Sequence, residues 1–238
     1  MGKDKEIQPA PGLGASFEKT PRATLQLSTK AQVWGHQSEA SWEPTGEKWQ
    51  AIGGREQVLQ QLGSRCAFCG LATQGLQVHS RDDRHLRVDL DNLAAADALC
   101  HGWHHLGELA AGDGYLVYLP GLSPQDINHL QRTLLIALSS DDAELREDAR
   151  ALMAWLVTHR DYVMRGWGTY EPAPFAQAIA RLNQVEGDPR EEVFAGLAVV
   201  FHPELMREDT RKWSRELQAH HPLSQWKQVY HAVMHSPA

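Results

Sequence analysis

Three cysteines and a run of histidines in the first half of the chain constrain the fold more than any other feature. Cys66 and Cys69 form the turn CAFCG, and Cys100 stands in the later stretch LCHGWHH. Two thiolates at Cys-x-x-Cys spacing can point at one ion, with the glycine letting the backbone fold behind them. An odd number of cysteines argues against a disulfide framework. The sequence therefore predicts a zinc site.

The fourth zinc ligand is not obvious, because the position three residues after Cys100 is Trp103, which cannot coordinate a metal. His104 lies four residues after Cys100, so on a helix the two side chains emerge from one face. We therefore expect a Cys3His zinc site made of Cys66, Cys69, Cys100 and His104, with His101 and His105 as alternative ligands. The competing interpretation is three cysteines buried as small apolar side chains.

Charge and hydropathy limit the classes of partner. The 238 residues carry a net charge of -7, which disfavours broad binding to a phosphate backbone, since that binding depends on clustered Lys and Arg. No stretch approaches the ~20 apolar residues that a membrane helix needs. The N-terminal residues lack the apolar core of a signal peptide. We expect a cytoplasmic protein that neither binds nucleic acid nor inserts into a membrane.

The first half of the chain mixes strand and helix signals. Residues 24–34 and 76–79 have the composition of strands, and 47–62 that of a helix interrupted by Gly53 and Gly54. Asp91 or Asn92 suits the cap of a short helix through 94–98, and YLVYLP predicts a further strand.

The second half is predicted to be helical. Ser123 and Pro124 suit the first positions of a helix with apolar residues at helical spacing. A second helix begins near Asp142, a third after Pro172, and two or three more fill 190–236 beyond a linker at 186–189. The expected class is α+β: a flexible tail (1–23), a small zinc-bound module (24–112), a helical region packed on it (113–185) and a helical extension (186–238).

The span from CAFCG through VHSRDDRHLRVDLDNLA to LCHGWHH resembles the HNH, or ββα-metal, endonuclease module. Its usual pattern is a Cys-x-x-Cys turn, a strand ending in Val-His-His, an Asn-Leu step and a Cys-x-x-Cys-His that starts a helix. Val78-His79 and Asn92-Leu93 match this pattern, but Ser80 stands where the second histidine belongs.

The resemblance assigns roles to these positions. In active members the second histidine is the general base, while the neighbouring histidine and the one after the last cysteine hold the catalytic metal. A serine hydroxyl is not basic near neutral pH, so Ser80 implies a degenerate nuclease with no catalytic residues. An active HNH endonuclease that cuts DNA with a divalent metal is the alternative.

A wider resemblance covers residues 24–185, through GYLVYLPGLSPQDINHL to THRDYVMRGWGTYEPAPFAQAIARL. This span resembles the IcmJ/DotN family of type IVB (Dot/Icm-type) secretion systems. Membership implies an HNH-like zinc fold without nuclease activity, acting as a structural adaptor in a coupling complex. The implied partners are the C-terminal segment of a VirD4-like coupling ATPase and other coupling-complex subunits, at the cytoplasmic side of the inner membrane.

Overall fold

The computed structural model describes residues 22–27, 47–81, 88–182 and 193–220. Within them the chain combines helices with two small antiparallel sheets, which confirms the mixed class predicted from the sequence. Several predicted segments lie outside the described residues: most of the tail, the linker at 186–189, and the helices beyond 220 with Trp226 and Tyr230. Of the predicted strand 24–34, only 24–27 is described, and it belongs to no sheet, although Leu25 and Leu27 are buried.

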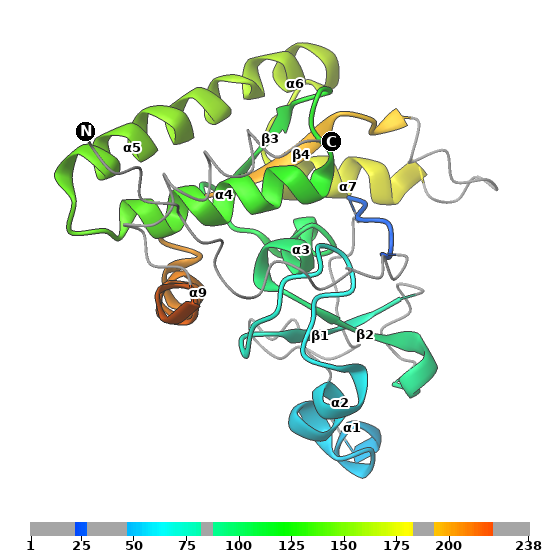
Figure 1. Cartoon of the computed structure of the whole chain (residues 1–238). Helices are drawn as coiled ribbons and strands as arrows, with labels where there is room; N and C mark the ends of the chain where they lie inside the picture. Colours follow the sequence, from blue (N-terminus) through cyan, green and yellow to red (C-terminus); the bar gives the residue numbers. More distant parts are fainter. Residues whose placement is uncertain (1–21, 28–46, 82–87, 183–192, 221–238) are drawn as a thin grey trace, which may run out of the picture.

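The described residues of 47–81 and 88–112 form the lower half of the molecule in Figure 1. Helices α1 (Glu47–Ala51) and α2 (Gly54–Leu62) replace the single interrupted helix, because Gly53 adopts a positive φ of 93°. Strand β1 (Gln77–Ser80) pairs antiparallel with β2 (Leu93–Ala96). Helix α3 (Ala98–Gly102) follows β2 directly, and short 3-10 turns η1 (Leu90–Asn92) and η2 (Leu106–Glu108) flank this unit.

The prediction of a helix through residues 94–98 is wrong. Residues 93–96 instead form β2, whose four side chains are all buried against neighbouring elements. Alanine favours helices, but pairing with β1 in the register Gln77 to Ala96 satisfies the backbone of this segment and overrides that preference. The following helix is capped by Asp97 rather than by Asp91 or Asn92.

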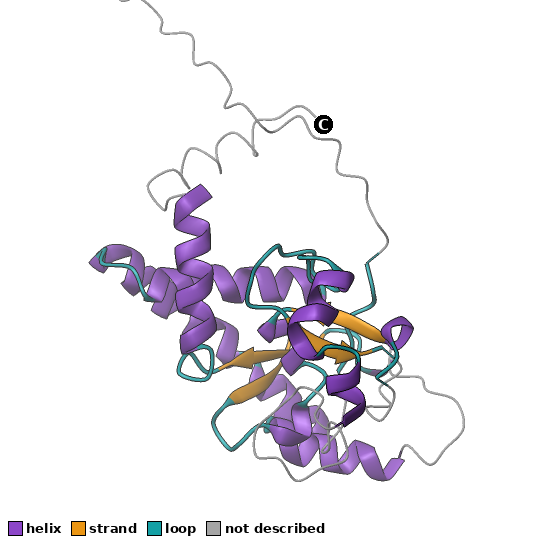
Figure 2. Cartoon of the chain, turned by 90° about the horizontal axis from the view of Figure 1, so that it is seen from below, coloured by secondary structure: helices purple, strands orange, loops and turns teal. Residues whose placement is uncertain are grey.

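The upper half holds a second sheet surrounded by helices. Strand β3 (Gly114–Tyr118) pairs with β4 (Leu197–Phe201), a strand that the sequence analysis had counted among helical stretches. Helices α4 (Pro124–Leu138), α5 (Ala143–Thr158), α6 (Arg160–Trp167), α7 (Pro172–Leu182) and α9 (Arg207–His220) complete this half. Figure 2 shows the strands near the centre with helices on both sides.

The helix starts follow the predicted capping residues. Ser123 Oγ accepts a hydrogen bond from the Asp126 amide with Pro124 in the first turn, and Asp142 caps α5. The second predicted helix is divided at His159, where α5 ends and α6 begins. None of the described helices is long and apolar enough to cross a bilayer.

Gln131 on α4 closes the free edge of β4. Its side-chain amide donates to the Val199 carbonyl over 2.7 Å, and its carbonyl oxygen accepts from the Phe201 amide over 2.9 Å. The side chain thus makes the two hydrogen bonds that another strand would make, and it is fully buried. This contact fixes α4 against the sheet, and α4 in turn carries the polar residues described below.

Replacing Gln131 with methionine, which has a similar volume, should leave both backbone groups of β4 buried without partners. We expect the free energy of unfolding to fall by about 3 kcal/mol. Urea denaturation followed by circular dichroism measures the change. Thr133→Ala, an exposed substitution on the same helix, should change stability by less than about 0.5 kcal/mol. Equal effects of the two substitutions would contradict the role given to Gln131.

Candidate metal centres

The Cys-x-x-Cys segment forms a tight turn that directs both sulfurs to one side. The Cys66 amide donates to the Leu71 carbonyl over 2.8 Å, and the Gly70 amide returns to the Cys66 carbonyl over 2.9 Å. Gly70 has φ of 76°, a conformation that glycine adopts without steric cost. Both cysteines are almost fully buried, so the turn packs its sulfurs inward.

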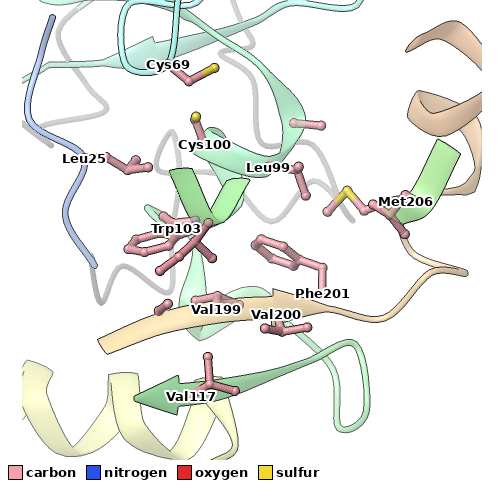
Figure 3. Packing of buried hydrophobic residues seen from close by; sticks show 14 of the residues in the cluster. Leu25, Cys69, Leu99, Cys100, Trp103, Val117, Val199, Val200, Phe201 and Met206 are labelled. Atoms are coloured by element: carbon pink, nitrogen blue, oxygen red, sulfur yellow. The ribbon is translucent and has the colours of Figure 1, made fainter. Parts of the chain in front are cut away.

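Cys100 and Asp97 complete a group of four metal-ligating side chains. Cys100 lies on α3, and the sulfurs of Cys69 and Cys100 point toward one another in Figure 3. Ligand atoms of Cys66, Cys69, Asp97 and Cys100 all lie within 4.8 Å of one another, and all four residues are buried. We call this group the sulfur centre. It confirms that the three cysteines come together, and it adds an aspartate that the sequence analysis did not consider.

The donor set of the sulfur centre fits a zinc ion. Zinc takes four ligands in structural sites, and thiolate and carboxylate are both among its ordinary ligands. Four protein ligands with no exposed side would leave no position for a substrate or water. The group therefore has the character of a structural metal site, although the identity of the metal stays a prediction.

The spacing of Asp97 explains why the fourth group escaped the sequence analysis. The sequence analysis treated Cys100 as the first residue of a second Cys-x-x-Cys pair. The partner would then stand three residues later, where the chain has Trp103. The structure has Cys100 as the second member, and Asp97 stands three residues before it at the start of α3. With Asp97 in place of the first cysteine, DALCH matches the Cys-x-x-Cys-His pattern noted above.

Asp97 is held by several donors at once. One carboxylate oxygen accepts from the Leu99 amide over 2.9 Å, which caps α3. The other accepts from Arg132 of α4 over 2.5 Å and from the Cys69 thiol over 3.3 Å. Burial raises the pKa of Asp97, and the positive charge of Arg132 opposes that rise. Burial alone would lower the pKa of Arg132, but Asp97 and the sulfur groups raise it, so the guanidinium is charged.

A second polar contact from α4 reaches the centre at Cys100. The side-chain amide nitrogen Nδ2 of Asn128 donates to the Cys100 sulfur over 3.3 Å. The orientation of the Asn128 side chain is fixed by the Trp103 indole N–H, which donates to Asn128 Oδ1 over 3.0 Å. Trp103 therefore does not bind metal, but it orients the donor that does contact a sulfur. Such N–H donors favour the thiolate form, which is the metal-ligating form.

The three thiols also interact with one another. Hydrogen bonds from Cys100 and Cys69 lower the pKa of Cys66, although burial opposes the change. The hydrogen bonds to Cys66 and Cys69, together with burial, raise the pKa of Cys100. One thiolate is thus stabilised within the group, and a divalent cation would favour deprotonation of the others.

A second group of metal-ligating side chains comes from β1, α3 and the residues that follow α3. Ligand nitrogens of His79, His101 and His105 lie within 4.8 Å of one another, and all three residues are buried. The His101 Nδ1–H donates to the side-chain oxygen Oε1 of Gln77 over 2.6 Å, so the Nε2 of His101 carries the lone pair. That Nε2 lies 2.9 Å from His105 Nε2. We call this group the histidine centre. It suits a divalent metal, because a second hydrogen bond on a ligating histidine is the usual arrangement.

His104 joins neither group. Its ring stacks on His79 with centroids 4.1 Å apart and lies 5.0 Å from the Phe68 ring. The structure thus brings together three of the four predicted zinc ligands, and it places the alternative ligands His101 and His105 in the histidine centre.

The position of the expected general base is occupied by a buried hydroxyl. Ser80 follows His79 at the end of β1 and is fully buried. The Asn92 side-chain Nδ2 donates to its Oγ over 3.2 Å, so the serine at the general-base position contacts the asparagine that matches the HNH pattern. The predicted loop residues between 82 and 87 lie outside the described part of the chain.

Comparison with known proteins gives one relative. No family model matches the chain. A type 4 apparatus protein, DotN of Legionella pneumophila, is 25% identical over 165 residues, which cover 67% of this chain and 77% of DotN. The chain is therefore a distant homologue of DotN, and the resemblance to the IcmJ/DotN family is confirmed.

The sulfur centre predicts which substitutions release metal. Asp97→Asn should lower zinc affinity by at least about tenfold, since it replaces a charged ligand. Asp97→Cys should keep one zinc, because it completes a four-cysteine site. Elemental analysis and competition with a chromogenic chelator measure both effects. His104→Ala should retain its full zinc content. If this variant lost its zinc while Asp97→Asn kept a normal zinc content, His104 rather than Asp97 would be the fourth ligand.

Cys66→Ser and Cys100→Ser should unfold the part of the chain built around the sulfur centre, because a small buried site couples metal binding to folding. Thermal melting followed by circular dichroism tests this expectation. Normal melting of both variants would show that the three cysteines act only as buried apolar side chains.

Proposed function

We propose that this distant relative of DotN is a zinc-stabilised, non-catalytic subunit of a type IV secretion coupling complex. The observation that carries the proposal is the sulfur centre, whose four ligating side chains are all buried. A closed site of this kind supports a fold and offers no open position for chemistry. The relationship to a type IV apparatus protein supports the assembly to which we assign the chain.

The arrangement around the sulfur centre supports an HNH-like module. A Cys-x-x-Cys turn, the β1–β2 hairpin and α3 follow one another in the order of a ββα-metal unit. The Ala67 amide in the turn donates to the Ala95 carbonyl of β2 over 2.8 Å, which ties the turn to the hairpin. We infer that the module serves as a rigid support for the helices around it.

We further propose that the partner is the C-terminal segment of a VirD4-like coupling ATPase, which would recruit the protein to the inner membrane. The family relationship supports this partner, and the acidic net charge is consistent with a protein partner rather than a nucleic acid. The chain is expected to co-purify with the VirD4-like coupling ATPase of its own secretion system. An ATPase truncated before its C-terminal segment is the matched control. Equal recovery of the truncated ATPase, or no recovery of either form, would refute this partner.

The alternative, an active HNH nuclease, draws support from the histidine centre. His79, His101 and His105 meet as metal ligands would, and His79 and His101 occupy positions that hold the catalytic metal in active members. The buried Ser80 hydroxyl, which accepts a hydrogen bond from the Asn92 side chain, supports the non-catalytic proposal over this alternative. Loss of a general base costs about 10²–10⁴-fold in rate.

Plasmid nicking with magnesium, manganese or nickel decides between the two functions. We expect no cleavage by the wild-type protein with any of these ions. His79→Ala removes a ligand of the histidine centre, and Ser80→His supplies the missing base as a matched comparison. Metal-dependent nicking by the wild type that disappears in His79→Ala would overturn the non-catalytic proposal.

A further inference from the structure

Helix α9 lies against α4 on the side where α4 approaches the sulfur centre (Figure 1). Its main contact is Trp213, which is 3% exposed and lies under the Arg132 guanidinium, 5.2 Å from Cζ to the ring centroid. A second contact joins Glu216 to the turn that follows the cysteines, because its carboxylate accepts from the Gln74 amide over 3.0 Å. The helix therefore contacts two neighbours of the sulfur centre.

Arg132 is bound from both sides. On its inner side it donates to Asp97 over 2.5 Å, and one of its nitrogens lies 3.8 Å from the Cys69 sulfur. Another nitrogen donates to His129 Nδ1 over 3.0 Å, so the His129 Nε2–H donates to the Cys69 carbonyl over 3.2 Å. On its outer side the guanidinium faces only the Trp213 ring among the aromatic side chains described. One cation thus joins the metal-ligating turn to α9.

The charge of the sulfur centre makes this cation necessary when metal is bound. Three thiolates and one carboxylate carry four negative charges, and a divalent cation neutralises two of them. Arg132 supplies one more positive charge at a buried position. Without the metal, the turn that carries Cys69 would lose the ion that joins it to Asp97 and Cys100. The groups that hold Arg132 in place are then no longer fixed.

We propose that metal binding at the sulfur centre and docking of α9 are thermodynamically linked through Arg132 and Trp213. The inference rests on the metal site assigned above and goes beyond it, because it gives the metal control over a distant helix. Linkage is reciprocal: if metal stabilises docked α9, docked α9 retains metal by the same factor.

The linkage also reaches a groove on the surface. A hollow of about 1200 Å³ lies between α2, the segment 71–76, α4 and α9. Trp213 and Leu217 of α9 form one wall, and Arg132 and His129 lie at its inner side. Because α9 provides that wall, undocking of α9 after metal loss would open the groove.

Hydrogen exchange on the full chain tests whether metal binding stabilises docked α9. After chelation, amides of 207–217 in α9 should exchange at least about tenfold faster, while those of 143–158 in α5 keep their protection. Helix α5 is a suitable reference because it also packs on α4. Unchanged protection of α9, with zinc loss verified by elemental analysis, would overturn the proposal.

Metal release from the loaded protein tests the reverse direction and does not require a folded metal-free state. Trp213→Ala should speed zinc transfer to a chelator by about tenfold, the size of effect seen when a neighbour of a metal ligand is removed. Leu156→Ala is the control, since it empties a buried position on α5 away from the sulfur centre. In an Arg132→Met background, Trp213→Ala should add nothing further. Equal release from Trp213→Ala and Leu156→Ala would overturn the linkage.

The two proposals fail in different ways. A purified protein without zinc, or a Cys66→Ser variant that keeps its metal, would remove the metal site and with it the premise of the linkage. Normal zinc content, lost in Cys66→Ser and released at an unchanged rate from Trp213→Ala, would refute the linkage alone.

Discussion

The buried ion pair between Asp97 and Arg132 is the interaction on which the centre of this molecule depends. Asp97 ends the hairpin, caps α3 and meets the cysteine turn, and Arg132 brings α4 to the same point. Removing one partner of such a pair leaves an uncompensated charge at a cost of about 3–5 kcal/mol. The pair therefore joins two halves of the chain that are distant in sequence. A bound cation would add to this arrangement, since it shares the same carboxylate.

The sulfur centre and the histidine centre are reached from different faces of one short helix. Cys100 and His101 are consecutive on α3, so their side chains diverge by about 100° around its axis. The first centre is closed by four buried ligands, and the second retains three histidines beside a serine in place of a base. This arrangement agrees with the proposal of a metal-stabilised, non-catalytic module.

The sequence predicted most elements of the fold where the signals were local. Capping residues located α4 and α5, and the glycine pair separated α1 from α2. Two strands were missed for a common reason. The Ala-rich β2 and the short β4 become strands only by pairing with β1 and β3, and that pairing is not encoded in either segment. Gln131 gives a further example, since a polar residue on an apolar helix face acts as the edge partner of β4.

The sequence by itself determined that three cysteines would meet, because Cys-x-x-Cys spacing and a third cysteine before a histidine-rich helix restrict the backbone to few geometries. Only the tertiary structure decided the fourth member of the group. Asp97 stands at the spacing of a first cysteine, but an acidic residue there is too common to indicate a ligand, and it becomes a candidate because β2 and α3 place it between Cys69 and Arg132. The roles of Trp103 and Trp213 were decided in the same way, by contacts that form only when α4 packs over the centre.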